Sequence, residues 1–274
     1  MTATTFNLQS KFKLNSGYEI PLLGFGIDSA ASYGNEAGCA ESIRASGIPR
    51  SEIFLTSKVP WKSVNYEAAK AQVDKTLAET GLEYIDLILL HAPYGGSGNR
   101  KGAWRALVEA VEAGKVRSIG VSNYGVHHLD ELEQHIKELE EERGGRGKGG
   151  VLSVGQWEMH PWCARNDIGE WCKKRGVAVE AYSPLVQGKR WGDKSLKSLA
   201  DKYGVSEAQV LIRWSLQKGY VPLPKSVTPK RIADNAAVYG FSLTADEMKQ
   251  LETDEYSPVC WDPCSTPLDN PREA

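Results

Sequence analysis

Side chains that can carry a proton or orient a polar ligand recur at one kind of position in this sequence, at or just after the end of a short apolar run. They are Lys58, His91, Asn123, Gln156, Tyr182 and Lys225. Lysine, histidine and tyrosine serve as acids or bases, and side-chain amides both donate and accept hydrogen bonds. In a barrel of parallel strands, the carboxyl ends of the strands meet at one face, where the active site lies. The spacing therefore predicts a single active site at that face.

The strongest strand signal is the run IDLILL at residues 85–90. A run of this length with apolar residues on both faces suits a strand that is buried on both sides of a parallel sheet. His91, Pro93 and a Gly/Ser loop follow it, and a helix-like pattern covers about residues 101–113. The unit is therefore a strand, a polar residue at its carboxyl end, a loop and a helix.

The rest of the chain repeats this unit, and strand and helix alternate at least six times. Further strands are predicted at 53–57, 118–121, 151–157, 177–181 and 221–223. Helices are predicted at 37–45, 65–80, 128–142, 168–175, 195–203, 206–218, 229–236 and 245–253. Alternation of this kind predicts an α/β fold with a parallel sheet, and the polar strand ends favour a (β/α)8 TIM barrel. A doubly wound open sheet is the alternative, which is weakened because no GxGxxG motif follows a strand.

Composition narrows the class of protein. The 274 residues are expected to form a single barrel domain, 1–274, and to be monomeric. A formal net charge of −2 gives no electrostatic case for nucleic acid or an anionic membrane surface. No apolar run approaches the ~18 residues of a membrane span, and the first residues lack the apolar core of a signal peptide. The five cysteines are scattered, which predicts reduced thiols in the cytoplasm and no metal site.

Seven motifs in order resemble the aldo-keto reductase family, and the resemblance covers nearly the whole chain. They are IDSAASYGNE (27–36), TSK (56–58), LLHAP (89–93), GVSNYG (120–125), VGQWEMHP (154–161), AYSPL (181–185) and PKSVTPKRIADN (224–235). The resemblance implies an eight-fold barrel that transfers a hydride between NADPH and the carbonyl of an aldehyde, ketone or sugar. It also implies that a tyrosine supplies the proton.

Carried over residue by residue, the resemblance makes Tyr33 the general acid, with Asp28, Lys58 and His91 as its partners. An alkoxide formed by hydride addition needs a proton at that moment, and a free tyrosine has a pKa of ~10, poorly matched to neutral pH. A lysine ammonium beside a phenol favours the phenolate. Asp28 would hold Lys58 charged and in place, and neutral His91 would donate a hydrogen bond to the substrate oxygen.

The same resemblance implies the residues that bind NADPH. Tyr182 would stack on the nicotinamide, and Ser122, Asn123 and Gln156 would bind its carboxamide. Lys225, Ser226 and Arg231 would surround the adenosine 2′-phosphate, because two cations and a hydroxyl suit a phosphate monoester. The remaining members of the predicted set are Asn235, near the adenine, and Ser183 and Leu185 of the motif AYSPL.

Two further groups are assigned no chemistry. His127, His128 and His135 lie on or beside a charged helix, which predicts that they are solvated. Cys260 and Cys264 lie in a tail that is predicted to be loop, and their spacing matches no known ligand pattern.

The sequence departs from the family at the first β/α unit. Members usually continue from a GFG strand end into a first helix and then a second strand, whereas here Gly24, Phe25 and Gly26 run directly into Ile27. A parallel crossover needs at least ~10–12 residues, so the first helix is predicted to be absent. We expect residues 20–30 to fill the second strand's place as one segment. The alternative function is therefore a catalytically impaired or inactive relative with weak or no NADPH binding.

Overall fold

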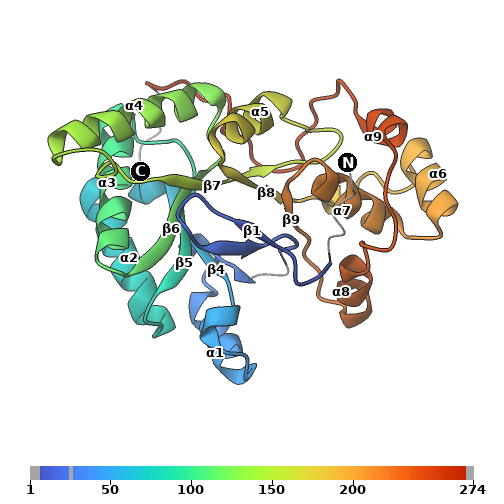
Figure 1. The fold of residues 1–274 in the computed structure, drawn as a ribbon, viewed down its shortest axis with the longest axis horizontal. Helices are drawn as coiled ribbons and strands as arrows, with labels where there is room; N and C mark the ends of the chain where they lie inside the picture. The colour runs from blue at the N-terminus through green and yellow to red at the C-terminus, as the bar shows by residue number, and fades with distance from the viewer. Residues whose placement is uncertain (1–6, 25–26, 270–274) are drawn as a thin grey trace.

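The computed structural model describes residues 7–24 and 27–269, and its core is a curved sheet of seven parallel strands (Figure 1). The strands are β3 (Ile27–Asp28), β4 (Leu55–Val59), β5 (Ile85–Leu90), β6 (Val116–Ser122), β7 (Leu152–Glu158), β8 (Ala178–Tyr182) and β9 (Val221–Leu223). Their order in the sheet follows their order in the chain. A doubly wound sheet reverses its order at a switch point, so the barrel prediction is confirmed, with the first unit incomplete.

Helices follow the strands and cover the outside of the sheet (Figure 1). They are α1 (Glu36–Ala45), α2 (Tyr66–Thr80), α3 (Ser97–Glu112), α4 (Val126–Glu142), α5 (Asn166–Arg175), α6 (Lys194–Tyr203), α7 (Glu207–Gln217), α8 (Pro229–Ala236) and α9 (Ala245–Leu251). Asn65 begins α2 as predicted, because its Oδ1 accepts a hydrogen bond from Ala68 N at 2.9 Å. Within the described ranges, no helix combines the length and the apolar character that a membrane span requires.

An antiparallel hairpin of β1 (Lys11–Lys13) and β2 (Glu19–Pro21) closes one end of the barrel. Leu14 and Ile20 of the hairpin pack into an apolar cluster with Leu87, Leu89, Val154 and Ala178 of the strands. Asn15 Nδ2 donates to Leu152 O, at the start of β7, at 2.9 Å. The hairpin therefore covers the amino-terminal ends of the strands and leaves the carboxyl ends open for a site.

The first β/α unit differs from the expectation in one respect. Ile27–Asp28 occupies the second strand's place as predicted and pairs in parallel with β4. The prediction that residues 20–30 fill that place as one segment is wrong, because Ile20 belongs to β2 of the hairpin and packs inside the barrel with Leu87 and Leu89. Gly24 N donates to Pro222 O of β9 at 3.0 Å, and Phe25 and Gly26 lie outside the described residues. Among the described strands, β3 and β9 are therefore the two edges of the sheet.

Candidate active site

A buried ion pair lies at the carboxyl ends of β3 and β4. Lys58 Nζ donates to Asp28 Oδ1 at 2.8 Å and to Ser29 O at 2.9 Å, and the lysine side chain is fully buried. Burial alone would lower the pKa of Lys58, but the Asp28 carboxylate outweighs burial, and the pKa is raised. Lys58 is therefore a cation at neutral pH, and Asp28 fixes its position.

Tyr33 lies next to this pair, at the end of a short 3-10 helix, Ala31–Tyr33. Gly34 ends the helix at a φ of 64°, a left-handed conformation that glycine adopts without strain. The Tyr33 ring centroid lies 5.2 Å from Lys58 Nζ and 5.9 Å from the ring centroid of His91. The side chain is 52% exposed, so its hydroxyl is accessible to a ligand beside a cation and an imidazole.

His91 follows β5 directly and is partly buried. Burial first, and the nearby Lys58 charge second, lower the pKa of His91 to about 4. The imidazole is therefore neutral at neutral pH and can act as a hydrogen-bond donor to a neutral carbonyl oxygen. Its Nδ1 is buried without a hydrogen-bond partner among the described residues.

A cleft of about 980 Å³ opens at this face of the barrel and is lined by Asp28, Tyr33 and His91. The structure therefore brings together the four predicted catalytic residues, with Lys58 buried beneath Asp28. Seven of the predicted cofactor residues line the same cleft: Ser122, Asn123, Gln156, Tyr182, Ser183, Lys225 and Ser226.

The predicted carboxamide-binding residues form many of their hydrogen bonds within the protein. Ser122 Oγ donates to Gln156 O at 2.9 Å. Asn123 Nδ2 donates to His91 O and to Ser122 Oγ, and its Oδ1 accepts from the Tyr182 hydroxyl at 2.9 Å. The Gln156 amide nitrogen donates to two carboxylates, so its carbonyl oxygen is the end that remains for a ligand. These bonds fix the amides and the Tyr182 ring along the cleft.

A second cleft, of about 640 Å³, continues from the first and shares Lys225 and Ser226 with it. It is also lined by the other three predicted cofactor residues, Leu185, Arg231 and Asn235. Within the described part of the chain, Lys225 and Arg231 are exposed cations that take part in no ion pair. The two clefts together fit a long ligand that carries an aromatic amide at one end and a phosphate toward the other.

Sequence reasoning missed several residues of these clefts. Trp61, Cys260 and Trp261 line the first cleft, and Trp191 lines the second. Trp61 comes three residues after Lys58, so its position at a strand end was a usable signal. Cys260 and Trp261 lie in the tail, which is loop as predicted and has no periodicity that indicates where it packs.

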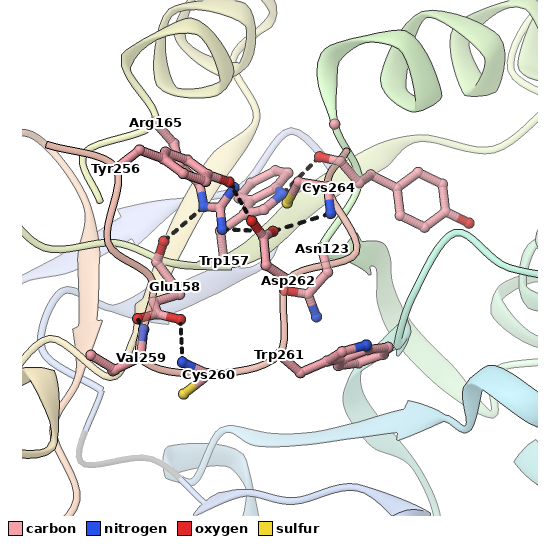
Figure 2. A network of polar contacts seen from close by, with 12 residues as sticks. Asn123, Trp157, Glu158, Arg165, Tyr256, Val259, Cys260, Trp261, Asp262 and Cys264 are labelled. Carbon is pink, nitrogen blue, oxygen red and sulfur yellow. Dashed lines mark hydrogen bonds and ion pairs between the residues drawn. The ribbon is translucent and has the colours of Figure 1, made fainter. Parts of the chain in front are cut away.

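A polar network holds this tail against the end of β7 (Figure 2). Glu158 is fully buried and accepts hydrogen bonds from Val259 N at 2.6 Å and Cys260 N at 3.0 Å. Arg165 donates to Glu158 O at 3.0 Å and to Asp262 Oδ1 at 2.9 Å, so one guanidinium joins both sides of the network. The network sets the position of Trp261, whose Nε1 donates to the Tyr94 hydroxyl at 3.1 Å.

Replacing Arg165 with methionine is expected to release the tail. The variant loses the charge-assisted bonds to Asp262 and to the Tyr256 hydroxyl, each worth roughly 1.5–3 kcal/mol. Amide hydrogen exchange over residues 256–264 should accelerate by roughly 10²–10⁴-fold, while exchange in β5 stays unchanged. Arg175→Met is the matched control, because this partly exposed arginine of α5 pairs with Glu133 and not with the tail. Unchanged exchange in the tail would show that Arg165 does not hold it.

Comparisons with known proteins agree with this geometry. The sequence profile described as the Aldo/keto reductase family matches residues 25–254. An uncharacterized oxidoreductase of Schizosaccharomyces pombe is 38% identical, over 95% of this chain and 100% of the relative. The glyoxal reductase of Bacillus subtilis is 36% identical, over 90% of this chain and 93% of its own length. The structure of a Bombyx mori aldo-keto reductase in complex with NADP aligns with a TM-score of 0.79 and 26% identity, covering 92% of this chain and 94% of that one. The chain therefore belongs to the aldo/keto reductase family, a family of oxidoreductases.

Proposed function

We propose that the protein transfers a hydride from NADPH to the carbonyl of an aldehyde, ketone or sugar, with Tyr33 as the general acid. The observation that carries the proposal is the arrangement at the head of the first cleft. There the Tyr33 ring lies 5.2 Å from the ammonium of a buried lysine and 5.9 Å from the ring of a neutral histidine. A carbonyl oxygen that becomes an alkoxide needs both a proton and hydrogen-bond donors.

Each of the four residues has a distinct task in this reaction. Tyr33 donates its proton to the oxygen, and the Lys58 cation stabilises the phenolate that remains. Asp28 holds Lys58 through the 2.8 Å ion pair. His91 donates a hydrogen bond to the same oxygen and orients the carbonyl. NADPH supplies the hydride when it is bound.

The donor set of the clefts supports NADPH as the cofactor. Tyr182 presents a ring and Gln156 a carbonyl oxygen in the first cleft, where the nicotinamide would lie. Lys225, Ser226 and Arg231 in the second cleft offer two cations and a hydroxyl for the 2′-phosphate. Two relatives agree with this proposal. The Bombyx mori aldo-keto reductase was solved in complex with NADP, and the Bacillus subtilis relative is named a glyoxal reductase.

The purified protein is expected to oxidise NADPH in the presence of a generic aldehyde and to prefer NADPH over NADH. The double variant Lys225→Met, Arg231→Met should lose roughly 10²–10⁴-fold in NADPH affinity and leave NADH affinity nearly unchanged, because each of the two charge-assisted phosphate contacts is worth roughly 1.5–3 kcal/mol. Lys249→Met is the matched control, since Lys249 is an exposed lysine of α9 that lines neither cleft. Equal binding of NADH and NADPH by the unmodified protein would contradict the assignment.

One observation favours the alternative, a catalytically impaired relative. The strand that carries Asp28 has only two residues and lies at an edge of the sheet. A weakly held Asp28 would leave Lys58 less well positioned. The aldehyde assay distinguishes an active reductase from an impaired relative, because the impaired relative would show no NADPH oxidation above background.

A further inference from the structure

Glu180 is a buried acidic residue that the proposed reaction does not use. It lies in β8, two residues before Tyr182, and is 2% exposed. Among the ion pairs of the described residues, none includes Glu180. A carboxyl group that is buried without a cationic partner costs stability, so its presence inside the barrel needs an explanation.

The contacts of Glu180 lead to the active site through Gln156. Gln156 Nε2 donates to Glu180 Oε2 at 2.8 Å and to Asp28 Oδ1 at 3.0 Å. Because the amide nitrogen of Gln156 can only donate, its bonds to two carboxyl oxygens fix the amide with the nitrogen toward them. The carbonyl oxygen of Gln156 is then the end left for a ligand in the first cleft.

The bond from Gln156 also holds the Asp28 side chain in place, in addition to the backbone pairing of β3 with β4. Asp28 belongs to the two-residue edge strand β3, which pairs on one side only, with β4. Gln156 belongs to β7 and reaches Asp28 across the interior of the barrel. A continuous series of hydrogen bonds therefore joins Glu180, Gln156, Asp28 and Lys58, from β8 to β4.

We propose that Glu180 is a positioning residue for the proposed reaction, which through Gln156 holds Asp28 against Lys58 and turns the Gln156 carbonyl oxygen toward the bound cofactor. This role rests on the proposed function. It accounts for a carboxyl group at a position where an apolar side chain would stabilise the barrel more.

The two charged residues that face Glu180 have opposite effects on its pKa: Asp28 raises it and Lys58 lowers it. Asp28 faces it from β3 and Lys58 from β4, while β7 contributes the neutral Gln156 and β9 the neutral Val221. Burial first, and the Asp28 charge second, raise the pKa of Glu180 to about 7. A carboxyl group whose pKa is higher in the folded state destabilises the fold progressively as pH rises from its unfolded value of ~4.3 to its folded value.

The test is Glu180→Gln, which keeps the volume but removes the charge and allows the two amides to pair in either orientation. We expect kcat/KM for carbonyl reduction to fall by roughly tenfold and the Kd for NADPH to rise, because Gln156 loses its fixed orientation. We also expect Tm to rise by a few degrees at pH 8 and by less at pH 5, because the buried charge is gone. A neutral-pH ionisation should disappear from the pH profile of kcat.

Glu247→Gln is the matched control. Glu247 is also a buried glutamate, but it lies in α9, bonded to Lys202 and Tyr203 and away from both clefts. Its partners lower the pKa of Glu247 to about 2, so this variant should lower Tm at pH 8 and leave kcat and KM unchanged. The opposite signs of the two Tm shifts separate a carboxyl group kept for function from one kept for stability.

Three results would overturn the proposal. Full kcat/KM in Glu180→Gln would show that Glu180 positions nothing. A fall in both Tm and activity at pH 8 would show that its role is structural. If the unmodified protein itself reduces no aldehyde, the proposed function fails and the role of Glu180 with it, a case recognised because variant and unmodified protein are then equally inactive.

Discussion

Replacing Tyr33 with phenylalanine is expected to lower the rate of carbonyl reduction by roughly 10²–10⁴-fold while leaving NADPH affinity within about twofold. The substitution removes only the hydroxyl group, and the ring keeps its contact with the edge of His91. In the proposed reaction the hydroxyl acts mainly in the transition state, when the substrate oxygen takes the proton. The buried Lys58 then has no phenolate to stabilise, so its charge cannot compensate.

Steady-state kinetics with an aldehyde and a fluorescence titration with NADPH measure the two effects separately. Tyr18→Phe is the matched control, because Tyr18 is 43% exposed and lies in the hairpin that closes the opposite end of the barrel. The control should retain full activity. Should Tyr33→Phe keep most of its rate, another group supplies the proton and the assignment of Tyr33 is wrong.

The positions of the polar residues at the strand ends could be predicted from the sequence because the sheet is parallel. Lys58 lies within β4, His91 directly follows β5 and Asn123 directly follows β6. Parallel strands in register bring their carboxyl ends to one face of the barrel. Residues at those ends can therefore be predicted to lie close together even when they are far apart in the chain. Local pattern was therefore enough to predict the barrel and the polar strand ends of the first cleft, whereas Asp28, Tyr33 and Arg231 were implied by the family resemblance.

The position of the tail could not be predicted in this way. Trp261 reaches the first cleft because Glu158 and Arg165 bond to residues about a hundred positions later in the chain. Such pairings depend on tertiary structure and leave no periodic signal in a loop. Glu180 was missed for a related reason, since a single acidic residue in an apolar strand does not reveal the partner that it faces.

The prediction that the helical histidines are solvated was wrong for two of the three. His128 and His135 are buried, and the inner face of α4 that they share also includes Leu132 and Leu139. These four positions recur at the spacing of one helix face, which the many charges of the helix obscured. Burial first, and His127 second, lower the pKa of His128 to about 3, so this histidine is neutral at neutral pH.

The incomplete first unit leads to the last prediction. The edges of the sheet, β3 and β9, are very short. Among the described residues outside the sheet, Gly24 bonds to β9 by donating its backbone N–H to Pro222 O. An unpaired edge and an uncovered barrel wall expose backbone donors and apolar surface to water. A helix and strand inserted between Gly26 and Ile27, in the manner of the family, would cover both.

We expect this insertion to raise Tm by roughly 10 °C, because covering the wall with an amphipathic helix should contribute a net ~3–5 kcal/mol to a domain held together by ~5–15 kcal/mol. NADPH should also bind more tightly, since a longer second strand holds Asp28 and Lys58 more rigidly beside the cleft. Melting curves and NADPH titrations on the native chain and on the helix insertion measure the two effects. A flexible insertion of equal length, made of glycine and serine, is the control for lengthening the loop between Gly26 and Ile27 without adding a helix, and it should lower Tm. Equal melting temperatures and equal affinities for the native chain and the helix insertion would show that the barrel is stable and functional without the first unit, and that the short edge strand β3 is sufficient to hold Asp28.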